Sequence, residues 1–143
     1  MDTSGIHLWL ILWKAYEACR AHAFRSIEKL GFCYSDFAVL ECLLHKGPLP
    51  VNTVGPKVSL TSGSITTAVD RLESRGLVER KDSKTDRRAR IVSLTPEGRR
   101  LIKAHFEKHE RDMEEIAKTL SEKERKTLTE LLKKYGMAAA EMK

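Results

Sequence analysis

Basic side chains are concentrated in one short segment of this 143-residue chain. The chain has a net charge of +6, and the eleven residues from Arg80 to Arg90 hold six basic and two acidic side chains, a local net charge of +4. A concentrated cationic patch is typical of proteins that bind the phosphate backbone of nucleic acid. A solvated surface segment is the other interpretation, and charge alone does not decide between the two.

Small hydroxylated residues form a second group, just before the basic segment. Ile65, Val69 and Leu72 recur at helical spacing, so a helix that buries them presents short hydroxyl side chains and one arginine on its other face. Short hydroxyls let a helix enter the major groove of DNA, and an arginine can span two acceptors of a guanine. A polar face exposed to solvent is the alternative. The candidate DNA contacts are Thr61, Ser62, Ser64, Thr66, Thr67 and Arg71 of this helix, and Asp86, Arg87, Arg88 and Arg90 of the basic segment.

Two helices are predicted before these residues. Residues 6–30 contain no Pro or Gly and predict one long helix that ends at Gly31. The first half of this helix is apolar nearly all round, which indicates burial on several sides, most simply against a second copy of the chain. The next helix is predicted from a cap at Ser35-Asp36 to Gly47-Pro48.

A short helix and a hairpin are predicted on either side of the hydroxyl-rich helix. Residues 51–58 predict a helix that is kinked or broken, because Pro56 disfavours helical geometry in the residue before it. The hydroxyl-rich helix ends at Gly76. Two β-type runs, 77–80 and 90–94, enclose nine polar and charged residues and predict a hairpin with a basic loop.

Two further helices are predicted at the C-terminal end. Pro96 opens a long helix that reaches about Lys118, and Ser121 with Glu124 forms a capping box for the last helix. The predicted fold is therefore mainly α with a small β-hairpin, and its helix pair followed by a basic hairpin is typical of a winged helix-turn-helix. We expect a single domain of residues 1–143, with a DNA-binding lobe at 35–95 and dimerisation helices at 1–30 and 96–143.

Three motifs make the sequence similar to a known family. The segments 72–80 and 94–98 and the triplet Asp86-Arg87-Arg88 resemble the MarR family of bacterial transcription regulators, and the similarity extends over essentially the whole chain. The family's wing pattern places Asp-x-Arg five residues before Leu-Thr, as in 86–88 and 94–95 here. Residues 62–66 and 69–73 are similar to the branch that responds to phenols and quinones. Pro56 departs from the family pattern and puts in doubt how rigidly its helix supports the next one.

The resemblance implies a homodimeric repressor that binds double-stranded DNA. Its two recognition helices, the hydroxyl-rich helices of the two copies, enter successive major grooves of an operator with two half-sites, while each hairpin reaches the minor groove. Arg88 at the hairpin tip would then lie where the potential of a narrow A·T-rich groove is most negative, with Asp86 holding its side chain in place. A surface salt bridge without a role in DNA binding is the alternative for this pair.

Aromatic residues of several predicted helices are candidates for an effector pocket. Planar aromatic molecules bind apolar pockets that offer one or two polar groups for orientation. Plain core packing is the alternative for each residue. The pocket candidates are Trp9, Trp13, Tyr16, Phe37, Phe106 and His109.

Two histidines have a spacing that suits a metal ion. His105 and His109 lie four residues apart, so one helix face presents both imidazoles, and His45, Glu41 and Cys33 are candidates to complete a zinc site. No zinc-enzyme motif surrounds them, so the favoured role is a polar lining in an apolar interior. We therefore expect no metal and no other cofactor.

The three cysteines are odd in number and lack paired spacing, which predicts reduced thiols and a cytoplasmic protein. Cys33 lies next to Tyr34 and is a candidate oxidant sensor if its pKa is lowered. Cys19 and Cys42 fall on apolar faces and are predicted core residues.

Several classes of function are excluded or disfavoured by what the chain lacks. No apolar run approaches the roughly 18 residues of a membrane span, so no membrane partner is expected. No nucleophile-base arrangement, phosphate loop or acidic pair supports catalysis, so we do not expect an enzyme. The alternatives to an aromatic-responsive repressor are a zinc- or redox-responsive regulator of the same fold and a winged helix that binds protein.

Overall fold

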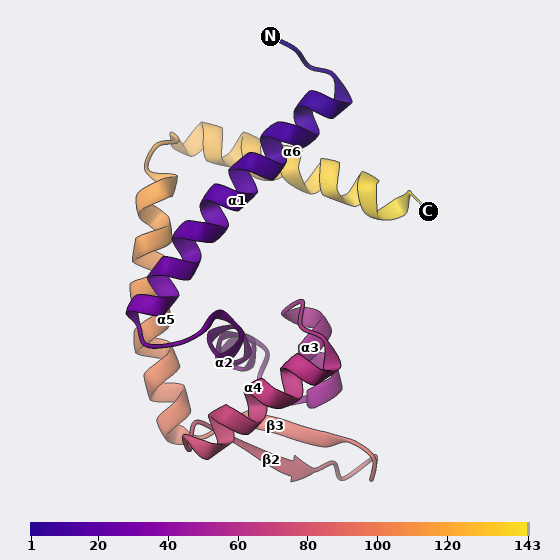
Figure 1. The fold of residues 1–143 in the computed structure, drawn as a ribbon, viewed down its shortest axis with the longest axis vertical. Coiled ribbons are helices and arrows are strands. Elements are labelled where there is room, and N and C mark those ends of the chain that lie inside the picture. Colours follow the sequence, from indigo (N-terminus) through magenta and orange to yellow (C-terminus); the bar gives the residue numbers. More distant parts are fainter. Residues whose placement is uncertain (143) are drawn as a thin grey trace. The chain divides into compact units, whose positions relative to one another are not determined.

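The computed structural model describes residues 1–142, which form six helices and three strands (Figure 1). The chain divides into two compact units, residues 1–109 and the residues from Glu110 onward. The predicted class, mainly helical with a small antiparallel sheet, is confirmed. In chain order the elements are α1 (Gly5–Lys29), α2 (Tyr34–Lys46), β1 (Leu49–Pro50), α3 (Val51–Lys57), α4 (Ser62–Ser74), β2 (Val78–Asp82), β3 (Arg90–Leu94), α5 (Pro96–Ala117) and α6 (Glu122–Glu141).

The core of the first unit forms where α2, α3 and α4 pack on the sheet. The three apolar residues predicted to face inward from α4, Ile65, Val69 and Leu72, are all almost completely buried. They pack in one cluster with Leu40 of α2 and Val92 of β3. This packing fixes which face of α4 remains exposed.

The sheet has three antiparallel strands in the order β1-β3-β2. The hairpin register runs from Val78 opposite Leu94 to Asp82 opposite Arg90. Strand β1, which pairs Leu49 with Val92, was not predicted. It has only two residues, one of them Pro50, and such a segment carries no alternating pattern.

The short helix, predicted to be kinked or broken at Pro56, is not broken, because α3 runs through Pro56 to Lys57. Pro56 lies in the last turn and therefore removes only one intrahelical hydrogen bond. Its predecessor Gly55 has no Cβ to meet the proline ring. A Cβ at Gly55 would also lie 3.1 Å from the carbonyl oxygen of Leu60 and 3.3 Å from Cγ2 of Ile65. The glycine thus permits both the proline and the close packing of α3 on α4.

The predicted cap of α2 is also wrong. The helix begins at Tyr34, and its N-cap residue is Cys33, whose side chain makes no capping hydrogen bond. Ser35 and Asp36 lie inside the first turn instead, and both accept hydrogen bonds from Arg71 of α4. The side chains of Ser35 and Asp36, expected to cap α2, therefore join α2 to α4 instead.

The junction between the hairpin and α5 explains part of the Thr-Pro-Glu-Gly motif. Thr95 caps α5, since its Oγ1 accepts a hydrogen bond from the Gly98 N–H at 3.0 Å. The same hydroxyl donates to the carbonyl oxygen of Gly76 at 2.7 Å. A Cβ on Gly98 would lie 1.9 Å from the carbonyl oxygen of Leu77, so only glycine fits this contact. The motif therefore locks the end of the hairpin to the start of α5.

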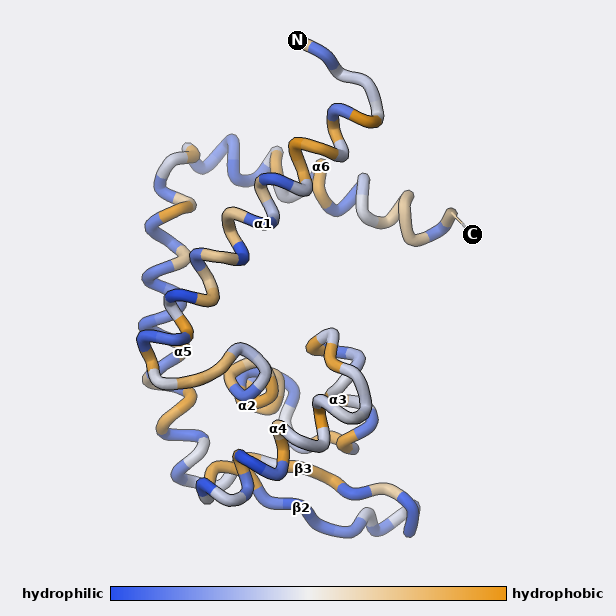
Figure 2. Tube along the Cα trace, in the orientation of Figure 1, coloured by the Kyte–Doolittle hydropathy of each residue, from blue (hydrophilic) through white to orange (hydrophobic). Residues whose placement is uncertain are grey.

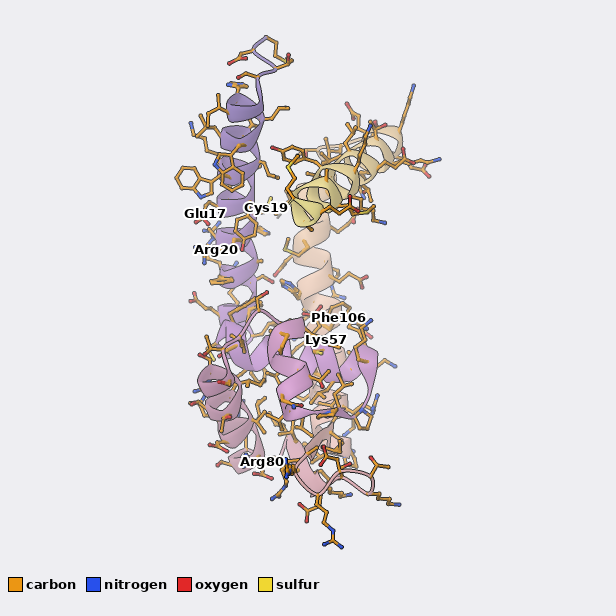
Figure 3. All side chains as sticks on the ribbon, turned by 90° about the vertical axis from the view of Figure 1, so that its right-hand side faces the viewer. Glu17, Cys19, Arg20, Lys57, Arg80 and Phe106 are labelled. Atoms are coloured by element: carbon orange, nitrogen blue, oxygen red, sulfur yellow. The ribbon has the colours of Figure 1, made fainter. Side chains whose placement is uncertain are left out.

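Apolar side chains remain exposed on the first half of α1. Trp9 is 53% and Trp13 50% exposed, and Figure 2 shows hydrophobic residues along this part of the helix. Cys19, predicted in the core, is exposed on the same helix, where Figure 3 shows side chains projecting all around. Cys42 is partly buried against the core, and burial raises the pKa of its thiol.

The second unit contains α6, whose predicted capping box is present. Ser121 Oγ accepts from the Glu124 N–H, and the Glu124 carboxylate accepts from the Ser121 N–H at 2.8 Å. Leu128, Leu131 and Tyr135 of this helix are exposed. Among residues 1–142, none of the helices combines the length and the hydrophobicity that crossing a membrane requires.

Candidate nucleic-acid interface

The exposed face of α4 carries the hydroxylated residues expected from the sequence. Because Ile65, Ala68, Val69 and Leu72 face the core, the remaining faces of the helix are open. The hydroxylated side chains that are exposed in its first two turns are Ser62, Ser64, Thr66 and Thr67, and Ser74 is exposed at its last residue.

Local hydrogen bonds orient these hydroxyls. Thr61 caps the helix, because its Oγ1 accepts from the Ser64 N–H at 3.2 Å, and it also donates to Ser64 Oγ at 3.0 Å. Thr66 donates to the carbonyl oxygen of Ser62 at 2.9 Å, and Thr67 to that of Gly63 at 3.0 Å. Both threonine oxygens therefore keep lone pairs that can accept from base amino groups, and both methyl groups are available for thymine.

Arg71, predicted on the same face, lies instead on the flank of α4 that adjoins α2. Its Nη2 donates to Oδ1 of Asp36 at 2.6 Å, and its Nε lies 3.2 Å from both Asp36 oxygens. The Arg71 side chain is 45% exposed, whereas that of Asp36 is 6% exposed. The hydrogen bond with Asp36 raises the pKa of Arg71 above its already high usual value. The predicted DNA contact is thus also part of an ion pair between two helices.

The hairpin loop is shaped by side chains that bond to its backbone. Ser83 Oγ accepts from the N–H groups of Thr85 and Asp86 at 3.3 and 3.2 Å. Asp86 Oδ1 accepts from the backbone N–H of Arg88 at 2.9 Å. The expectation that Asp86 holds the Arg88 guanidinium is therefore corrected, since the carboxylate fixes the loop backbone.

The predicted basic residues differ in how they are paired. Arg90 forms an ion pair with Asp82 across the hairpin, with Nε 3.3 Å from Oδ1. Within residues 1–142, Arg87 and Arg88 form no salt bridge, and both are exposed. Of the predicted basic residues of the hairpin, Arg87 and Arg88 are therefore the two without a carboxylate partner within residues 1–142.

Arg80, which was not among the predicted site residues, joins the hairpin to α4. Its Nη2 lies 2.7 Å from Oδ1 of Asp70 and 2.5 Å from Oε2 of Glu73. Its backbone N–H also donates to Glu73 at 3.3 Å. The Arg80 guanidinium holds the pKa of Glu73 below its usual range. The sequence signal was present, because Asp70, Glu73 and Arg80 belong to the motifs that carry the family resemblance.

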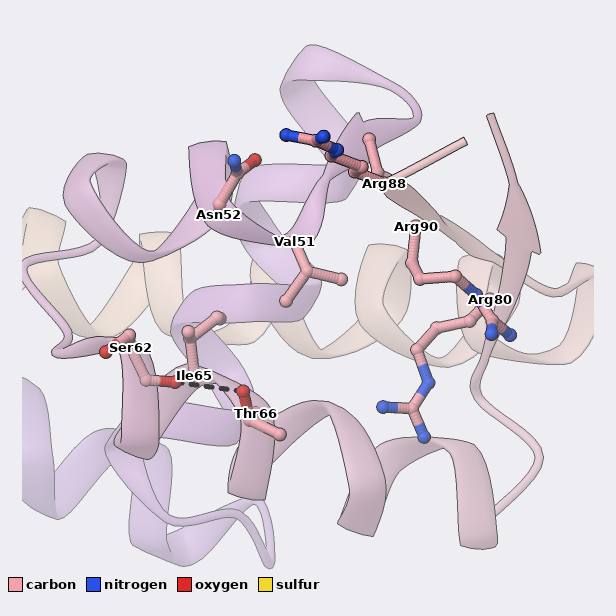
Figure 4. A pocket seen from close by; sticks show the side chains of 9 residues that line it. Val51, Asn52, Ser62, Ile65, Thr66, Arg80, Arg88 and Arg90 are labelled. Atoms are coloured by element: carbon pink, nitrogen blue, oxygen red, sulfur yellow. Dashed lines mark hydrogen bonds between the residues drawn. The ribbon is translucent and has the colours of Figure 1, made fainter. Parts of the chain in front are cut away.

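A hollow of about 290 Å³ connects α3, α4 and the hairpin (Figure 4). Three arginines from the hairpin, Arg80, Arg88 and Arg90, line it together with Ser62 and Thr66 of α4. Figure 4 shows Arg88 near Asn52 of α3 at one side of the hollow, while Thr66 and Arg80 lie along α4 and β2. The hydroxyl-rich helix and the basic hairpin therefore form one continuous surface.

The predicted pocket residues of α2 and α5 make aromatic contacts. Phe37 is 1% exposed, and its ring meets that of His109 edge-on at 5.2 Å. His109 Nδ1 is 2.9 Å from Ser26 Oγ. The ring of Phe106 meets His45 at 4.8 Å. These residues form a layer of aromatic rings with polar groups inside the first unit.

The α1 members of the predicted pocket are not enclosed in the chain by itself. Trp9, Trp13 and Tyr16 are at least half exposed. A separate hollow of about 370 Å³ is lined instead by other residues of α2 and by the end of α3. Its lining residues are Tyr34, Ala38, Glu41, Cys42, His45, Lys46, Lys57 and Val58.

The two histidines considered as metal ligands have different surroundings. His105 lies against Phe32, with ring centroids 5.5 Å apart, and its buried Nδ1 has no hydrogen-bond partner among residues 1–142. Burial, followed by Lys108 and Arg75, lowers the pKa of His105. No group of three potential ligands comes together in the part of the chain that the structure describes, residues 1–142, and this includes Cys33, Glu41 and His45.

Comparisons with known proteins agree with this geometry. The sequence profile of the MarR family matches residues 34–89. The HTH-type transcriptional regulator MhqR of Bacillus subtilis is 40% identical over 139 residues, which are 97% of this chain and 96% of the relative.

Two solved structures show the same fold. A cysteine-to-serine mutant of MarR from E. coli, in complex with operator DNA, has a TM-score of 0.79 and 26% identity over 91% of this chain and 94% of that one. BpsR of Bordetella bronchiseptica, whose DNA binding is regulated by 6-hydroxynicotinic acid, has a TM-score of 0.78 and 25% identity, with 91% and 98% covered.

Proposed function

Because this chain belongs to the MarR family of transcription regulators, we propose that it acts as a homodimeric repressor, bound to an operator with two half-sites and released by a small aromatic effector. DNA binding follows from the family. The dimer, the contact residues and the effector are the proposal.

The observation that carries the proposed DNA contacts is the surface shared by α4 and the hairpin. Hydroxyls of α4 and three arginines of the hairpin line one hollow. Small hydroxyls suit the major groove, and guanidiniums suit phosphates and the minor groove beside it. Arg80 and Arg90 are held there by carboxylates of α4 and β2, whereas Arg88 lines the hollow without a carboxylate partner in residues 1–142, which supports a role for Arg88 in binding an anion.

The proposed roles divide between the helix and the loop. The hydroxyls of α4 meet base edges and phosphates, with Thr61 at the cap and Arg71 at the flank. The loop carries Arg87 and Arg88 toward the minor groove, and Arg90 and Asp86 hold its shape. In this arrangement residues 35–95 form the DNA-binding lobe, and residues 1–30 and 96–143 form the dimer.

The support for a homodimer is the apolar surface that each unit leaves exposed. Trp9 and Trp13 of α1 are half exposed, and so are Leu131 and Leu132 of α6. Exposed apolar patches of this kind mark interaction sites in soluble proteins. A second copy also supplies the second recognition helix that a two-half-site operator needs.

The support for an aromatic effector is the ring layer around His109. The half-buried ring of Phe106 offers apolar surface, and the half-buried His109 offers a polar group that can orient a ligand, whereas the buried Phe37 ring meets a ligand only if the layer opens. Trp9, Trp13 and Tyr16 complete this lining in the proposed dimer. The regulation of BpsR by an aromatic acid is a precedent on the same fold.

The test is to let the protein select its own site from a pool of random duplexes. We expect enrichment of a near-palindrome whose half-sites are separated by about one helical turn. Affinity for it should fall steeply between about 50 and 200 mM salt. If the pool yields no duplex that binds more tightly than random DNA, the chain is not a sequence-specific repressor, and protein binding becomes the role to pursue.

A further inference from the structure

The ion pair between Arg71 and Asp36 joins the recognition helix α4 to the start of α2. Arg71 Nη2 donates to Asp36 Oδ1 at 2.6 Å and to Ser35 Oγ at 3.2 Å, and Nε lies 3.2 Å from both carboxylate oxygens. The thiol of Cys33 lies 3.8 Å from the same Nη2. The N-cap residue of α2, Cys33, and two residues of its first turn, Ser35 and Asp36, therefore surround one edge of the guanidinium.

The carboxylate of this pair is firmly placed. The Asp36 side chain is 6% exposed, and it lies in the first turn of α2, where the helix dipole favours a negative charge. A buried carboxylate without its partner would be left with an uncompensated charge. Arg71 is therefore costly to detach from Asp36.

The bound edge is the one that an arginine needs to read a guanine. A guanidinium offers two parallel N–H groups either through Nε and Nη2 or through Nη1 and Nη2. Both arrangements use Nη2, which already donates to Asp36 and Ser35. No hydrogen bond from Nη1 is recorded among residues 1–142, and the side chain is 45% exposed. One end of the cation thus remains open to an anion.

The place of Arg71 along α4 also disfavours a base contact. In helix-turn-helix proteins the residues near the start of the recognition helix reach the base edges. Arg71 is in the third turn of α4, which runs from Ser62 to Ser74, and it points to the α2 flank. A phosphate beside the groove is the DNA group that a cation at this position meets.

We propose that Asp36 is a positioning residue for DNA binding, which fixes the guanidinium of Arg71 as a contact to the DNA backbone that does not depend on sequence. This inference rests on the proposed function and specifies one of its contacts. The base sequence is then read by the hydroxyls of α4 and by the hairpin, and Arg71 sets how the helix is seated.

The test uses the selected operator, the same duplex substituted at each base pair in turn, and a random duplex, titrated between about 50 and 200 mM salt. The main variant is the double change Arg71→Ala with Asp36→Asn, because it leaves no unpaired buried carboxylate. The matched control is Arg20→Ala with Glu17→Gln, which removes an arginine–carboxylate pair of α1, with Nη2 3.0 Å from Oε2.

We expect the double variant to weaken binding to all duplexes by the same factor, roughly fivefold per half-site near 0.15 M salt, from a log–log salt slope of about 0.9 per phosphate contact. The slope should fall by about that amount per half-site, and the control should leave it unchanged. Asp36→Asn by itself should lose at least half of the same logarithmic affinity, although the cation is still present. Arg71→Lys, which keeps the charge and is the safer variant for folding, should also bind every duplex more weakly.

Three results would overturn the inference. A loss confined to one base pair would make Arg71 a base reader. If Asp36→Asn or Arg71→Lys binds DNA with wild-type affinity, then holding the guanidinium in place has no role in DNA binding, whatever the change in stability. A wild-type protein that prefers no duplex would remove the proposed function itself, which is distinguishable because the first two results require specific binding by the wild type.

Discussion

At the scale of single residues, a substitution of Arg88 distinguishes a hairpin that contacts DNA from one that is only solvated. Its backbone is fixed by Asp86, its side chain lines the hollow beside α4, and it forms no salt bridge within residues 1–142. We expect Arg88→Ala to weaken operator binding, most strongly where the base pairs under the hairpin are A·T, because a narrow minor groove attracts arginine. Binding titrations against operators with A·T or G·C at those positions measure the effect. Unchanged affinity near 0.15 M salt would transfer the role to Arg87 or Arg90.

His105 gives the fold a dependence on pH. Burial, together with Lys108 and Arg75, lowers the pKa of His105, and its Nδ1 has no hydrogen-bond partner in residues 1–142. The unfolded chain takes up this proton near the ordinary histidine pKa of about 6.5, before the folded chain does. The contribution of His105 to stability is therefore complete above about pH 6.5 and decreases as the pH falls toward the lowered pKa.

We expect His105→Gln to reduce the difference in unfolding free energy between about pH 8 and pH 5.5, measured by denaturant titration. The same substitution at the more exposed His7 serves as the control, since it removes one imidazole without removing a buried one. An equal reduction in both variants would show that the pH dependence does not come from the burial of His105.

At the scale of elements, the recognition helix is held on both flanks by arginine–carboxylate pairs. Arg71 ties α4 to α2, and Arg80 ties it to β2 through Asp70 and Glu73. The carboxylates of α4 would otherwise face the phosphates, so Arg80 also neutralises negative charge on the proposed DNA surface. The hairpin and α4 are thereby held together as one surface.

The Glu73 pair predicts a dependence of stability on acidic pH. Its pKa is lowered in the folded chain, so its contribution is present above the unfolded carboxylate pKa of about 4.3 and is lost as the pH falls through the lowered value. We expect Glu73→Gln to flatten the decrease of the unfolding free energy below about pH 4.3. The expected change in the unfolding free energy is small, because the Glu73 side chain is 37% exposed and water screens the pair. A slope identical to that of the wild type would show that the pair is not maintained in solution.

The elements that the sequence predicted well are those set by local chemistry. Helix ends at Gly31 and Gly76 and the inward face of α4 all depend on neighbouring residues, and all are confirmed. The errors occur where a distant partner decides. Asp36 left its expected capping role for Arg71, 35 residues away, and β1 exists only because β3 lies beside it.

The residues of the candidate site also divide into those predicted from local sequence and those whose contacts depend on distant partners. The hydroxyl face of α4 follows from helical spacing, so it was predicted. The pairing of Arg71 and Arg80 depends on how α2, α4 and β2 pack, and sequence spacing does not encode these distances. Pro56 is an exception, because its effect is local: Gly55 has no Cβ to meet the proline ring, so the helix continues through the proline although the general rule for residues before proline predicted otherwise.

At the scale of the whole molecule, the exposed apolar residues predict a dimer. One chain has a mass of 16.3 kDa, so sedimentation at micromolar concentration should give twice this mass. Trp13→Glu should shift the distribution toward the monomer, because burying a charge in an apolar interface is costly. Lys14→Glu, on the next residue of α1, is the control and should leave the dimer intact. A folded wild-type monomer would remove the basis for binding two half-sites.

The last prediction concerns how an effector releases DNA. A ligand shifts the dimer away from the DNA-binding arrangement only by its preference for the other arrangement, and a tenfold loss of operator affinity requires a preference of about 1.4 kcal/mol. By reciprocity the operator must weaken effector binding by the same factor. Titrating phenols, quinones and aromatic acids into the protein with and without operator DNA should therefore give dissociation constants that differ in step with the DNA effect.

Substitutions in the ring layer test whether the effector that weakens operator binding binds there. Phe106→Ala should weaken effector binding while leaving operator affinity unchanged in the absence of effector, because Phe106 lies against His45 and does not line the hollow shared by α4 and the hairpin. Equal effector constants with and without DNA would mean that the compound only fills a cavity. A response that disappears in Cys33→Ser but survives in Phe106→Ala would instead assign the sensing to thiol chemistry, since Cys33 is exposed and lies beside the Arg71 guanidinium.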